Sequence, residues 1–450
     1  MQVDPSLSIA NPNPVLTSTK QKIALAAVAI GVLMMLVAWA SGGMVAIPPS
    51  LFLALSLGFI TVGTVTYARD VYLHKPPGIN NNGVFFKSLS DRGIYGWMLG
   101  VLLTGFYVLL YWYSEYMTGL IRLFDPLSQV LRGHSADQWF VYGAFYTISI
   151  ILMGYKFALK YRHNRYQLIR TASVVFFQLG FSFLIPSFLA LMNEPEYYFS
   201  YFWPLKTDSL KPDGIQWIMQ SSSHHLGLFF IGFSVLMTFI GVPILTYFFG
   251  KRWYCSWVCG CGGLAETTGD PFRHLSDKSM KAWKIERWMI HSVLIFVTVM
   301  TGLLWLNSAF HGEILGKLSL GFSKTYGFLI GSIFSGVIGT GFYPILGSRS
   351  WCRFGCPQAA ILGLFQRKKS KFRITTNGGQ CISCGNCSTY CEMGIDVKAY
   401  AQKGQDVVRA SCVGCGICAA VCPRGVLRLE NGDLDIVERA MVTRNEHVNG

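Results

Sequence analysis

The last part of the chain carries eight cysteines in two runs of the same spacing. The runs are Cys381, Cys384, Cys387 and Cys391, followed by Cys412, Cys415, Cys418 and Cys422. Each run reads C-x2-C-x2-C-x3-C, and Pro423 follows the second run. Thiolates at this spacing are typical ligands of [4Fe–4S] clusters, whereas a zinc site usually takes two C-x2-C pairs. The spacing therefore predicts two [4Fe–4S] clusters rather than a zinc ribbon or a disulfide framework.

The two runs are expected to exchange their fourth ligands. In the two-cluster pattern, three cysteines of one run bind a cluster together with the last cysteine of the other run. The first cluster would then take Cys381, Cys384, Cys387 and Cys422, and the second would take Cys412, Cys415, Cys418 and Cys391. The stretch resembles a bacterial two-[4Fe–4S] ferredoxin module.

Five further cysteines lie in two short aromatic motifs upstream. The motif W-Y-C-S-W-V-C-G-C at 253–261 contains Cys255, Cys259 and Cys261, and W-C-R-F-G-C-P at 351–357 contains Cys352 and Cys356. Thiols at i and i+4 share one face of a helical turn, so two such pairs at one membrane depth would bring four thiolates together. A third iron–sulfur cluster, another soft metal such as copper(I) or zinc, and a redox-active dithiol all fit this arrangement. Ordinary buried cysteines are the weaker alternative, because the pairs repeat in spacing, flanking aromatics and position.

The composition indicates that a membrane positions these motifs. Of the 450 residues, 52% are hydrophobic and only 14% are charged, against about a quarter charged in soluble domains. Apolar runs long enough to span a bilayer predict about eight transmembrane helices. We expect these at about 22–41, 48–68, 94–114, 138–158, 171–192, 223–249, 288–308 and 326–347. The predicted fold is an all-α polytopic membrane bundle with a C-terminal α+β two-cluster ferredoxin-like domain.

The chain divides into four regions on this basis. A polar tail occupies 1–20 and does not read as a signal peptide. A four-helix membrane region follows at 21–168 and a second four-helix core with both C-x3-C motifs at 169–370. The ferredoxin domain occupies 371–450.

The distribution of Lys and Arg indicates an orientation. The net charge is +15, but the basic residues lie between apolar runs, which argues against nucleic-acid binding. Every second connection is basic, starting with the one after the second helix, and such loops stay on the cytoplasmic side. We therefore expect a multi-pass protein of the bacterial cytoplasmic (inner) membrane, with both termini and the ferredoxin domain in the cytoplasm.

The combined motifs resemble the NapH/NosR/CcoG family of membrane polyferredoxins. The resemblance rests on the two aromatic C-x3-C motifs and the eight C-terminal cysteines, and covers roughly 170–430. It implies electron transfer at the cytoplasmic membrane, often between the quinol pool and a periplasmic reductase, and the family is also linked to copper reduction. The sequence departs from the pattern in the first motif: Gly260 stands where the family has the proline kept as Pro357, and Cys261 is extra.

The predicted function is membrane-bound electron transfer between the [4Fe–4S] clusters and a membrane partner or quinone, as in a quinol dehydrogenase-like subunit of an oxidoreductase. The alternative is a copper reductase or assembly factor for a respiratory oxidase or reductase. The expected partners are the bilayer, other redox subunits and a quinone. A quinol site needs a base near a lipid-accessible pocket. Candidates at the outer face are His224, His225, Glu194, Glu196 and Trp217, and at the inner face Glu266 and Asp270.

Overall fold

A computed structural model describes residues 18–73, 87–310, 321, 324–325 and 327–431 of the chain. Within these residues, seven helices are long and apolar enough to cross a membrane. They are α1 (Thr19–Ala40), α2 (Pro49–Tyr72), α4 (Ile94–Trp112), α7 (Gln138–Lys160), the helix Arg165–Leu191, the helix His225–Phe249 and α15 (Met280–Ala309). A shorter apolar helix, η8 (Gly327–Ile338), lies where the eighth span was expected. The predicted fold of a helical membrane bundle with a cysteine-rich C-terminal domain is confirmed.

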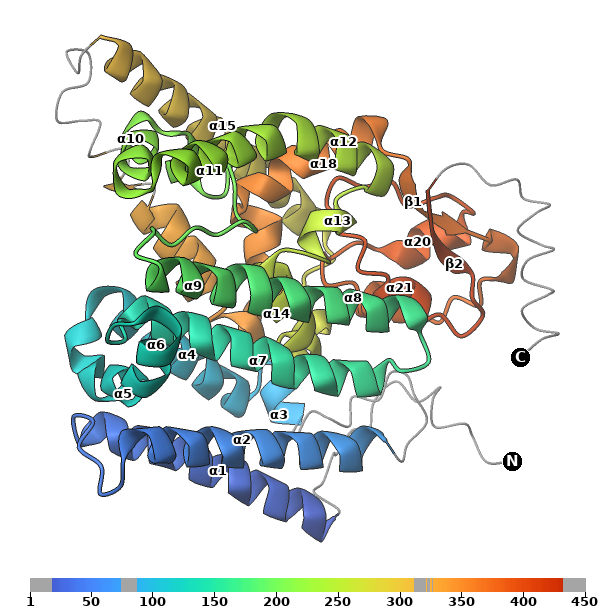
Figure 1. Cartoon of the computed structure of the whole chain (residues 1–450). Helices are drawn as coiled ribbons and strands as arrows, with labels where there is room; N and C mark the ends of the chain where they lie inside the picture. The colour runs from blue at the N-terminus through green and yellow to red at the C-terminus, as the bar shows by residue number, and fades with distance from the viewer. Residues whose placement is uncertain (1–17, 74–86, 311–320, 322–323, 326, 432–450) are drawn as a thin grey trace.

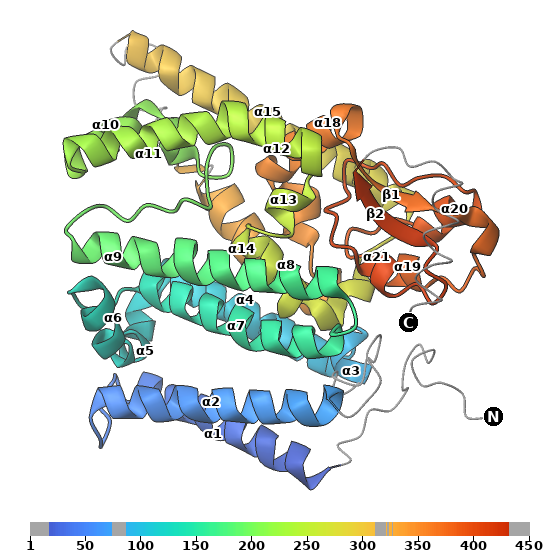
Figure 2. The same cartoon turned by 45° about the vertical axis from the view of Figure 1, so that its right-hand side comes forward.

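The helices lie side by side with the ferredoxin domain at one end of the bundle (Figures 1 and 2). At one edge, α1 and α2 pack closely because they present small residues to each other. A Cβ on Gly31 would lie 2.6 Å from the carbonyl oxygen of Ser56, and one on Gly63 would lie 2.5 Å from that of Ala24. Ser56 Oγ donates to the Gly31 carbonyl oxygen at 2.8 Å, which fixes the approach.

Two spans contain a π-helical segment directly before a proline. The span Arg165–Leu191 consists of α8 (Arg165–Phe176), η4 (Phe177–Leu184) and α9 (Ile185–Leu191), and Pro186 lies in the first turn of α9. The next span is α11 (His224–Leu236), η6 (Met237–Gly241) and α12 (Val242–Phe249), again with a proline, Pro243, in the first turn of α12. Proline lacks an N–H and clashes with the carbonyl one turn earlier, so the wider π turn relieves the clash.

The connecting segments are short and partly helical. The end of the bundle away from the ferredoxin domain carries η3 (Ser114–Met117), α5 (Thr118–Leu123), α6 (Asp125–Arg132), η5 (Thr207–Leu210) and α10 (Pro212–Ser221). The other connections contain α3 (Lys87–Ser90), α13 (Arg252–Cys255), α14 (Gly260–Thr267), η7 (Asp270–Leu275), α17 (Tyr343–Leu346) and η9 (Trp351–Gly355). Helix α15 begins at Met280, earlier than expected, because the Ser279 side chain accepts from Ala282 N and caps its basic first turns.

The C-terminal domain is built on a two-stranded antiparallel sheet. Strand β1 (Phe372–Thr376) pairs with β2 (Leu427–Asn431), with Phe372 opposite Asn431 and Thr376 opposite Leu427. Helix α18 (Pro357–Lys369) leads into the domain, which also contains η10 (Gly378–Gln380), α19 (Asn386–Thr389), α20 (Val397–Gln402) and α21 (Ile417–Ala420). Lys371 N donates to the Tyr247 carbonyl oxygen at 2.8 Å, so the domain is joined directly to the end of α12.

Candidate iron–sulfur sites and the network between them

Four cysteines of the ferredoxin domain surround one small cavity. The lining includes Cys381, Cys384, Cys387 and Cys422. These are three cysteines of the first run and the last of the second. Burial raises the pKa of the Cys387 thiol to about 11. A cluster bound there would therefore replace protons on these thiols.

The other four cysteines surround a second cavity. Its lining includes Cys391, Cys412, Cys415 and Cys418, together with apolar side chains such as Val407 and Val413. Burial raises the pKa of Cys412 to about 12. Each cavity thus offers four converging sulfurs in a largely apolar setting, which fits the donor set of a [4Fe–4S] cluster.

The two cysteine loops share a backbone pattern with a repeat of 31 residues. Ser383 and Gly385 in the first loop have positive φ angles of 59° and 82°, and Gly414 and Gly416 in the second have 63° and 74°. The left-handed region tightens each loop so that successive thiols point inward. The same holds one turn after each fourth cysteine, where Gly394 has a φ of 66° and Gly425 one of 60°.

Both C-x3-C motifs place their thiols together in the protein interior. Cys255, Cys259, Cys352 and Cys356 are each only 5–6% exposed. The pKa of Cys356 is raised well above its usual value, first by burial and then by the charges of Cys352, Cys255 and Cys259. The four thiols therefore lie near enough to one another for their charges to interact, and we call them the four-thiol group.

The local geometry of these motifs differs from the expectation of one helical turn. Helix α13 ends at Cys255, and Cys259 has an extended backbone with φ −67° and ψ 125°. Cys356 is also extended, with φ −83° and ψ 112°. The second cysteine of each pair is the N-cap of the next helix, α14 or α18, so the interpretation as i and i+4 on one helix face is wrong. The extended residue turns the thiol back toward its partner while the chain starts a new helix.

Packing explains why the first motif has glycine where the second has proline. A Cβ on Gly260 would lie 2.5 Å from Gln178 Oε1 and 2.7 Å from Tyr201 Oη. Pro357 occupies the equivalent first position of α18, where a missing N–H is harmless. The membrane span η4 thus presses against the first motif at this point.

Cys261 lies beside the four thiols of the C-x3-C motifs and faces a large cavity. Its hydrogen bond with Cys259 is the main cause that lowers the pKa of Cys259 to about 7. Cys261 is half-buried and lines a cavity of about 670 Å³. The extra cysteine of the first motif therefore lies between the four-thiol group and this cavity.

The cavity extends toward the end of the bundle away from the ferredoxin domain. Aromatic and polar side chains line it, including Tyr146, Gln178 and Tyr201 near Cys261. Gln178 Oε1 has no hydrogen-bond partner within the described part of the chain. At the far end it is lined by charged residues, which are Arg132, Glu196, Lys206, Asp208 and Lys211. Burial lowers the pKa of Lys206.

Of the residues proposed for a quinone at the outer face, Glu196 lines this cavity. It pairs with Arg132 at 2.6 Å and accepts from Tyr198 Oη at 2.8 Å. Glu194 instead accepts from Ser223 N at 3.0 Å. Two others, His225 and Trp217, are exposed, and the side chain of His224 lies outside the described residues.

Arg349 connects the four-thiol group with the ferredoxin domain. Its Nη1 donates to the Cys255 carbonyl oxygen at 3.2 Å and lies 3.7 Å from Cys352 Sγ. Its Nε donates to Glu392 Oε1 at 3.0 Å and its Nη2 to Glu266 Oε1 at 2.6 Å. Glu392 directly follows the last cysteine of the first run. One guanidinium therefore bridges the two regions that carry the thiols.

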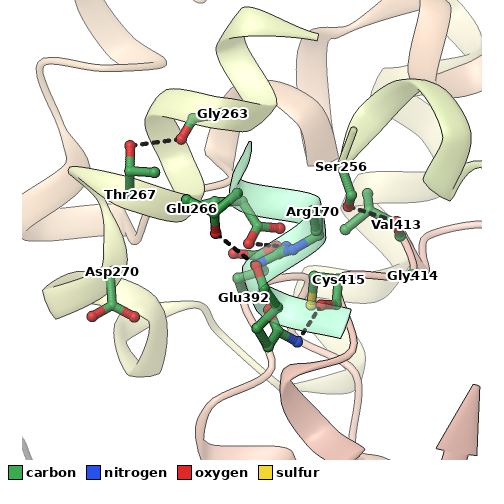
Figure 3. A network of polar contacts seen from close by, with 12 residues as sticks. Arg170, Ser256, Gly263, Glu266, Thr267, Asp270, Glu392, Val413, Gly414 and Cys415 are labelled. Atoms are coloured by element: carbon green, nitrogen blue, oxygen red, sulfur yellow. Dashed lines mark hydrogen bonds and ion pairs between the residues drawn. The ribbon is translucent and has the colours of Figure 1, made fainter. Parts of the chain in front are cut away.

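Arg170 and Arg273 complete a buried ionic network around the same carboxylates. Figure 3 shows Arg170, Glu266 and Glu392. Arg273 pairs with Glu392 at 2.7 Å and with Glu266 at 3.2 Å, and Arg170 also pairs with Glu266. Burial alone would raise the pKa of Glu266, but the three guanidinium groups lower it to about 2. Cys415 Sγ lies within 4.8 Å of carboxylate oxygens of Glu266 and Glu392.

The network continues to the inner end of α7. Asp270 accepts from Lys160 Nζ at 2.7 Å and from Arg273 Nε at 2.9 Å. Burial alone would raise the pKa of Asp270, but Lys160 and Arg273 lower it. Glu266 and Asp270, the inner-face quinone candidates, are thus both engaged in buried ion pairs.

The charges of the network are unequal. Four cations face three carboxylates, namely Lys160, Arg170, Arg273 and Arg349 against Glu266, Asp270 and Glu392. Among the residues joined by these ion pairs, cations outnumber carboxylates by one, beside two sites for anionic thiolate-bound clusters. The network was not predicted from the sequence, although an acid next to a cluster cysteine and an arginine just before a C-x3-C motif mark its two ends.

Comparison with known families and proteins agrees with these sites. A 4Fe-4S binding domain matches twice, at 231–279 and 327–375, and each match contains one C-x3-C motif. A 4Fe-4S dicluster domain matches residues 380–427. The protein is a multi-pass membrane protein whose cysteine-rich ferredoxin motifs bind [4Fe–4S] clusters. The repetition of this match agrees with the repetition of the C-x3-C motif in the sequence.

One curated relative is similar to part of the chain. It is "Putative electron transport protein YccM" of Escherichia coli (strain K12), 28% identical over 190 residues. The alignment covers 37% of this chain and 48% of the relative, so the chain matches about half of that protein's length. No solved structure matches the chain.

Proposed function

We propose that the protein transfers electrons between its ferredoxin clusters and a redox centre at the membrane face. The observation that carries the proposal is the placement of the thiols. Eight surround two cavities in the ferredoxin domain. Four more lie together on the other side of Arg349, which contacts both Glu392 and Cys352. The ligands of the first cluster would be Cys381, Cys384, Cys387 and Cys422, and those of the second Cys391, Cys412, Cys415 and Cys418. The name of the similar protein, which refers to electron transport, supports the same function.

The four buried thiols of the C-x3-C motifs would hold a third cluster. Hydrogen bonds to sulfur and the surrounding dielectric set the potential of such a centre. Arg349 Nη1 lies at hydrogen-bond distance from Cys352 Sγ, and Ala359 N donates to Cys356 Sγ at 3.4 Å. Both contacts stabilise the more negatively charged state. Cys261 would stay outside the ligand set and face the 670 Å³ cavity.

A quinone bound in that cavity is the membrane partner that the lining favours. A volume of this size is typical of small-molecule sites. A hydroquinone gives up two electrons and two protons when it is oxidised, and the reverse reaction takes up both. Glu196 and Lys206 line the far end as titratable groups, and the unpartnered Gln178 Oε1 lies near Cys261. The protein would then be the electron-transfer subunit of a quinone-linked oxidoreductase.

The proposal also covers the orientation of the protein in the membrane and the role of each region of the chain. The basic connections after α7 and α12 lie at the ferredoxin end of the bundle, which supports a cytoplasmic ferredoxin domain in the inner membrane. The helices of 21–168 would serve as a docking surface for redox subunits, the core of 169–370 would carry the membrane-face centre, and 371–450 would carry the two clusters.

The test is iron and acid-labile sulfide content with electron paramagnetic resonance of anaerobically purified protein. We expect about twelve irons per chain in the wild type and about eight in Cys352→Ala, since each cluster holds four. Cys261→Ala should keep all twelve but slow cluster reduction by a quinol. Fewer than about eight irons in fully loaded wild type would contradict the two-cluster proposal.

A second candidate is copper reduction or assembly of a respiratory enzyme. It rests on the four buried thiols, because soft thiolate ligands also select copper(I). Copper that co-purifies with the wild type, is lost in Cys255→Ala and replaces the four extra irons would favour this function over a third cluster.

A further inference from the structure

A further cavity, distinct from the two cysteine cavities and from the 670 Å³ cavity, lies where the membrane bundle meets the ferredoxin domain. It has a volume of about 280 Å³ and is lined by the first turns of α15, by α18 and by the loop 408–411. Cys352 is part of its wall. The proposed electron-transfer function gives this cavity no role.

The wall of this cavity is strongly basic. Five basic side chains line it, which are Lys251, Arg287, Arg353, Arg367 and Arg409, against a single carboxylate, Glu286. Arg353 Nε pairs with Glu286 at 2.6 Å, and Ser411 Oγ donates to the other carboxylate oxygen. The acid is therefore already satisfied within the wall.

The remaining four cations have no carboxylate partner among the described residues. In the part of the chain that the structure describes, no ion pair joins Lys251, Arg287, Arg367 or Arg409 to a carboxylate. Lys251 is 1% exposed, and its Nζ donates to the Ala410 carbonyl oxygen at 3.1 Å. A buried cation next to other cations is costly unless an anion joins it.

Trp283 holds two of the guanidinium groups in place. The Cζ atoms of Arg287 and Arg409 lie 5.1 Å and 4.7 Å from the centre of its ring. Arg409 Nη1 also donates to Tyr400 Oη at 3.3 Å. Stacked guanidinium groups are preorganised to bind phosphate oxygens through several donors.

The rim of the cavity carries exposed apolar side chains. Leu364 and Val408 line the cavity and are 42% and 40% exposed. On α15, the neighbouring Ile285 and Trp288 are 43% and 79% exposed, and tryptophan at the end of a span is typical of the lipid headgroup region. A ligand that fits must combine a phosphate with an apolar portion.

We propose that this cavity binds the phosphate headgroup of an anionic phospholipid, with its acyl chains along the exposed apolar residues of α15 and α18. Basic pockets between helices at a membrane surface are known to take such headgroups. The bound lipid joins α15, α18 and the ferredoxin loop, and it adds a negative charge next to Cys352. It thus helps to fix the ferredoxin domain on the membrane core.

Native mass spectrometry of the delipidated full-length protein in neutral detergent tests the proposal. The probes are dioctanoyl phosphatidylglycerol, dioctanoyl phosphatidylcholine and inorganic phosphate. We expect phosphatidylglycerol to bind more tightly than phosphatidylcholine. Arg287→Gln and Arg409→Gln should each weaken it about fivefold, since one basic group near a membrane surface contributes about 1 kcal/mol.

Matched controls lie on the same helices. Lys284 and Lys368 are exposed and do not line the cavity, so Lys284→Gln and Lys368→Gln should leave phosphatidylglycerol binding unchanged. Arg287 and Arg367 are exposed too, so Arg287→Gln and Arg367→Gln preserve the fold and can be combined. Equal binding of both lipids, or equal loss in cavity and control variants, would overturn the proposal. Inorganic phosphate that displaces phosphatidylglycerol at equal concentration would assign the cavity to a soluble anion and overturn the lipid assignment.

Discussion

The ferredoxin domain and the membrane face hold their thiols in different ways. In the ferredoxin domain, each cavity draws three of its four cysteines from one tight loop whose left-handed residues turn the sulfurs inward. At the membrane face, two cysteine pairs almost 100 residues apart meet only because the spans and Arg349 bring them together. The first arrangement depends mainly on local sequence and the second on tertiary packing, so the two should respond differently to substitution.

The largest effect should come from pairs of cysteine substitutions that test the crossed ligand sets. Cys391→Ala combined with Cys412→Ala should remove about four irons per chain, because both thiols surround one cavity. Cys391→Ala combined with Cys381→Ala should remove about eight, although these two belong to the same run. Iron analysis with electron paramagnetic resonance measures both. The opposite result would mean that each run binds its own cluster.

Removing the bridging guanidinium should be the next largest effect. Arg349→Gln leaves Glu266 and Glu392 with one partner fewer in a fully buried site, and breaking a buried ion pair costs about 3–5 kcal/mol. We expect a lower midpoint of thermal unfolding and loss of the membrane-face centre, while the two ferredoxin clusters remain.

The control for Arg349 is an ion pair whose carboxylate is exposed. Lys211 pairs with Asp208 at 2.7 Å, and Asp208 is 64% exposed, so Asp208→Asn should change stability by less than about 1 kcal/mol. Arg349→Lys keeps the charge but not the planar set of donors. Its loss of stability should therefore lie between those of Arg349→Gln and Asp208→Asn. If Arg349→Gln keeps the membrane-face signal unchanged, the guanidinium is not a support of that site.

The same contrast explains how much of the molecule the sequence predicted. The fold followed from apolar runs and from the two cysteine runs, because span length and cluster spacing are local properties. The seven long helices and the small C-terminal sheet agree with that expectation. The C-x3-C spacing predicts one helical turn through Cys255 and Cys259. This prediction is wrong, because Cys259 has an extended backbone and caps a new helix.

The buried network could not be read from the sequence. Arg349, Glu392 and Arg170 lie in three separate segments, and basic residues next to membrane spans are also explained by topology alone. Only the fold shows that these charges lie against one another rather than in solvent; Figure 3 shows Arg170 beside Glu266 and Glu392. The 670 Å³ cavity was equally hidden, because Gln178 and Glu196 reach it from different elements.

A loss of stability of intermediate size should distinguish the two membrane-face motifs when Gly260 and Pro357 are each replaced by alanine. Gly260→Ala puts a methyl group against Gln178 Oε1 and Tyr201 Oη, and overpacking of this kind costs about 1–3 kcal/mol. At the equivalent position, Pro357→Ala fits a first helical turn and should cost much less. Thermal unfolding of the two variants measures the difference. Equal midpoints of thermal unfolding would show that η4 moves aside to accommodate a side chain at position 260. Packing would then not be the reason for glycine there.

The smallest effect should come from equivalent positions in the two ferredoxin loops. Ser383 already carries a side chain at a φ of 59°, and Gln402 Nε2 donates to its Oγ at 2.8 Å, so Ser383→Ala should cost no more than about 1 kcal/mol. Gly414 has nearly the same φ, but a Cβ there would lie 2.5 Å from Arg252 Cβ and 3.0 Å from the Phe372 ring. Gly414→Ala should therefore destabilise more, because this loop packs on the membrane core whereas the first loop is exposed at Ser383. Cluster content against temperature measures both, and an equal loss in the two variants would mean that backbone conformation, not contact with the membrane core, limits the second loop.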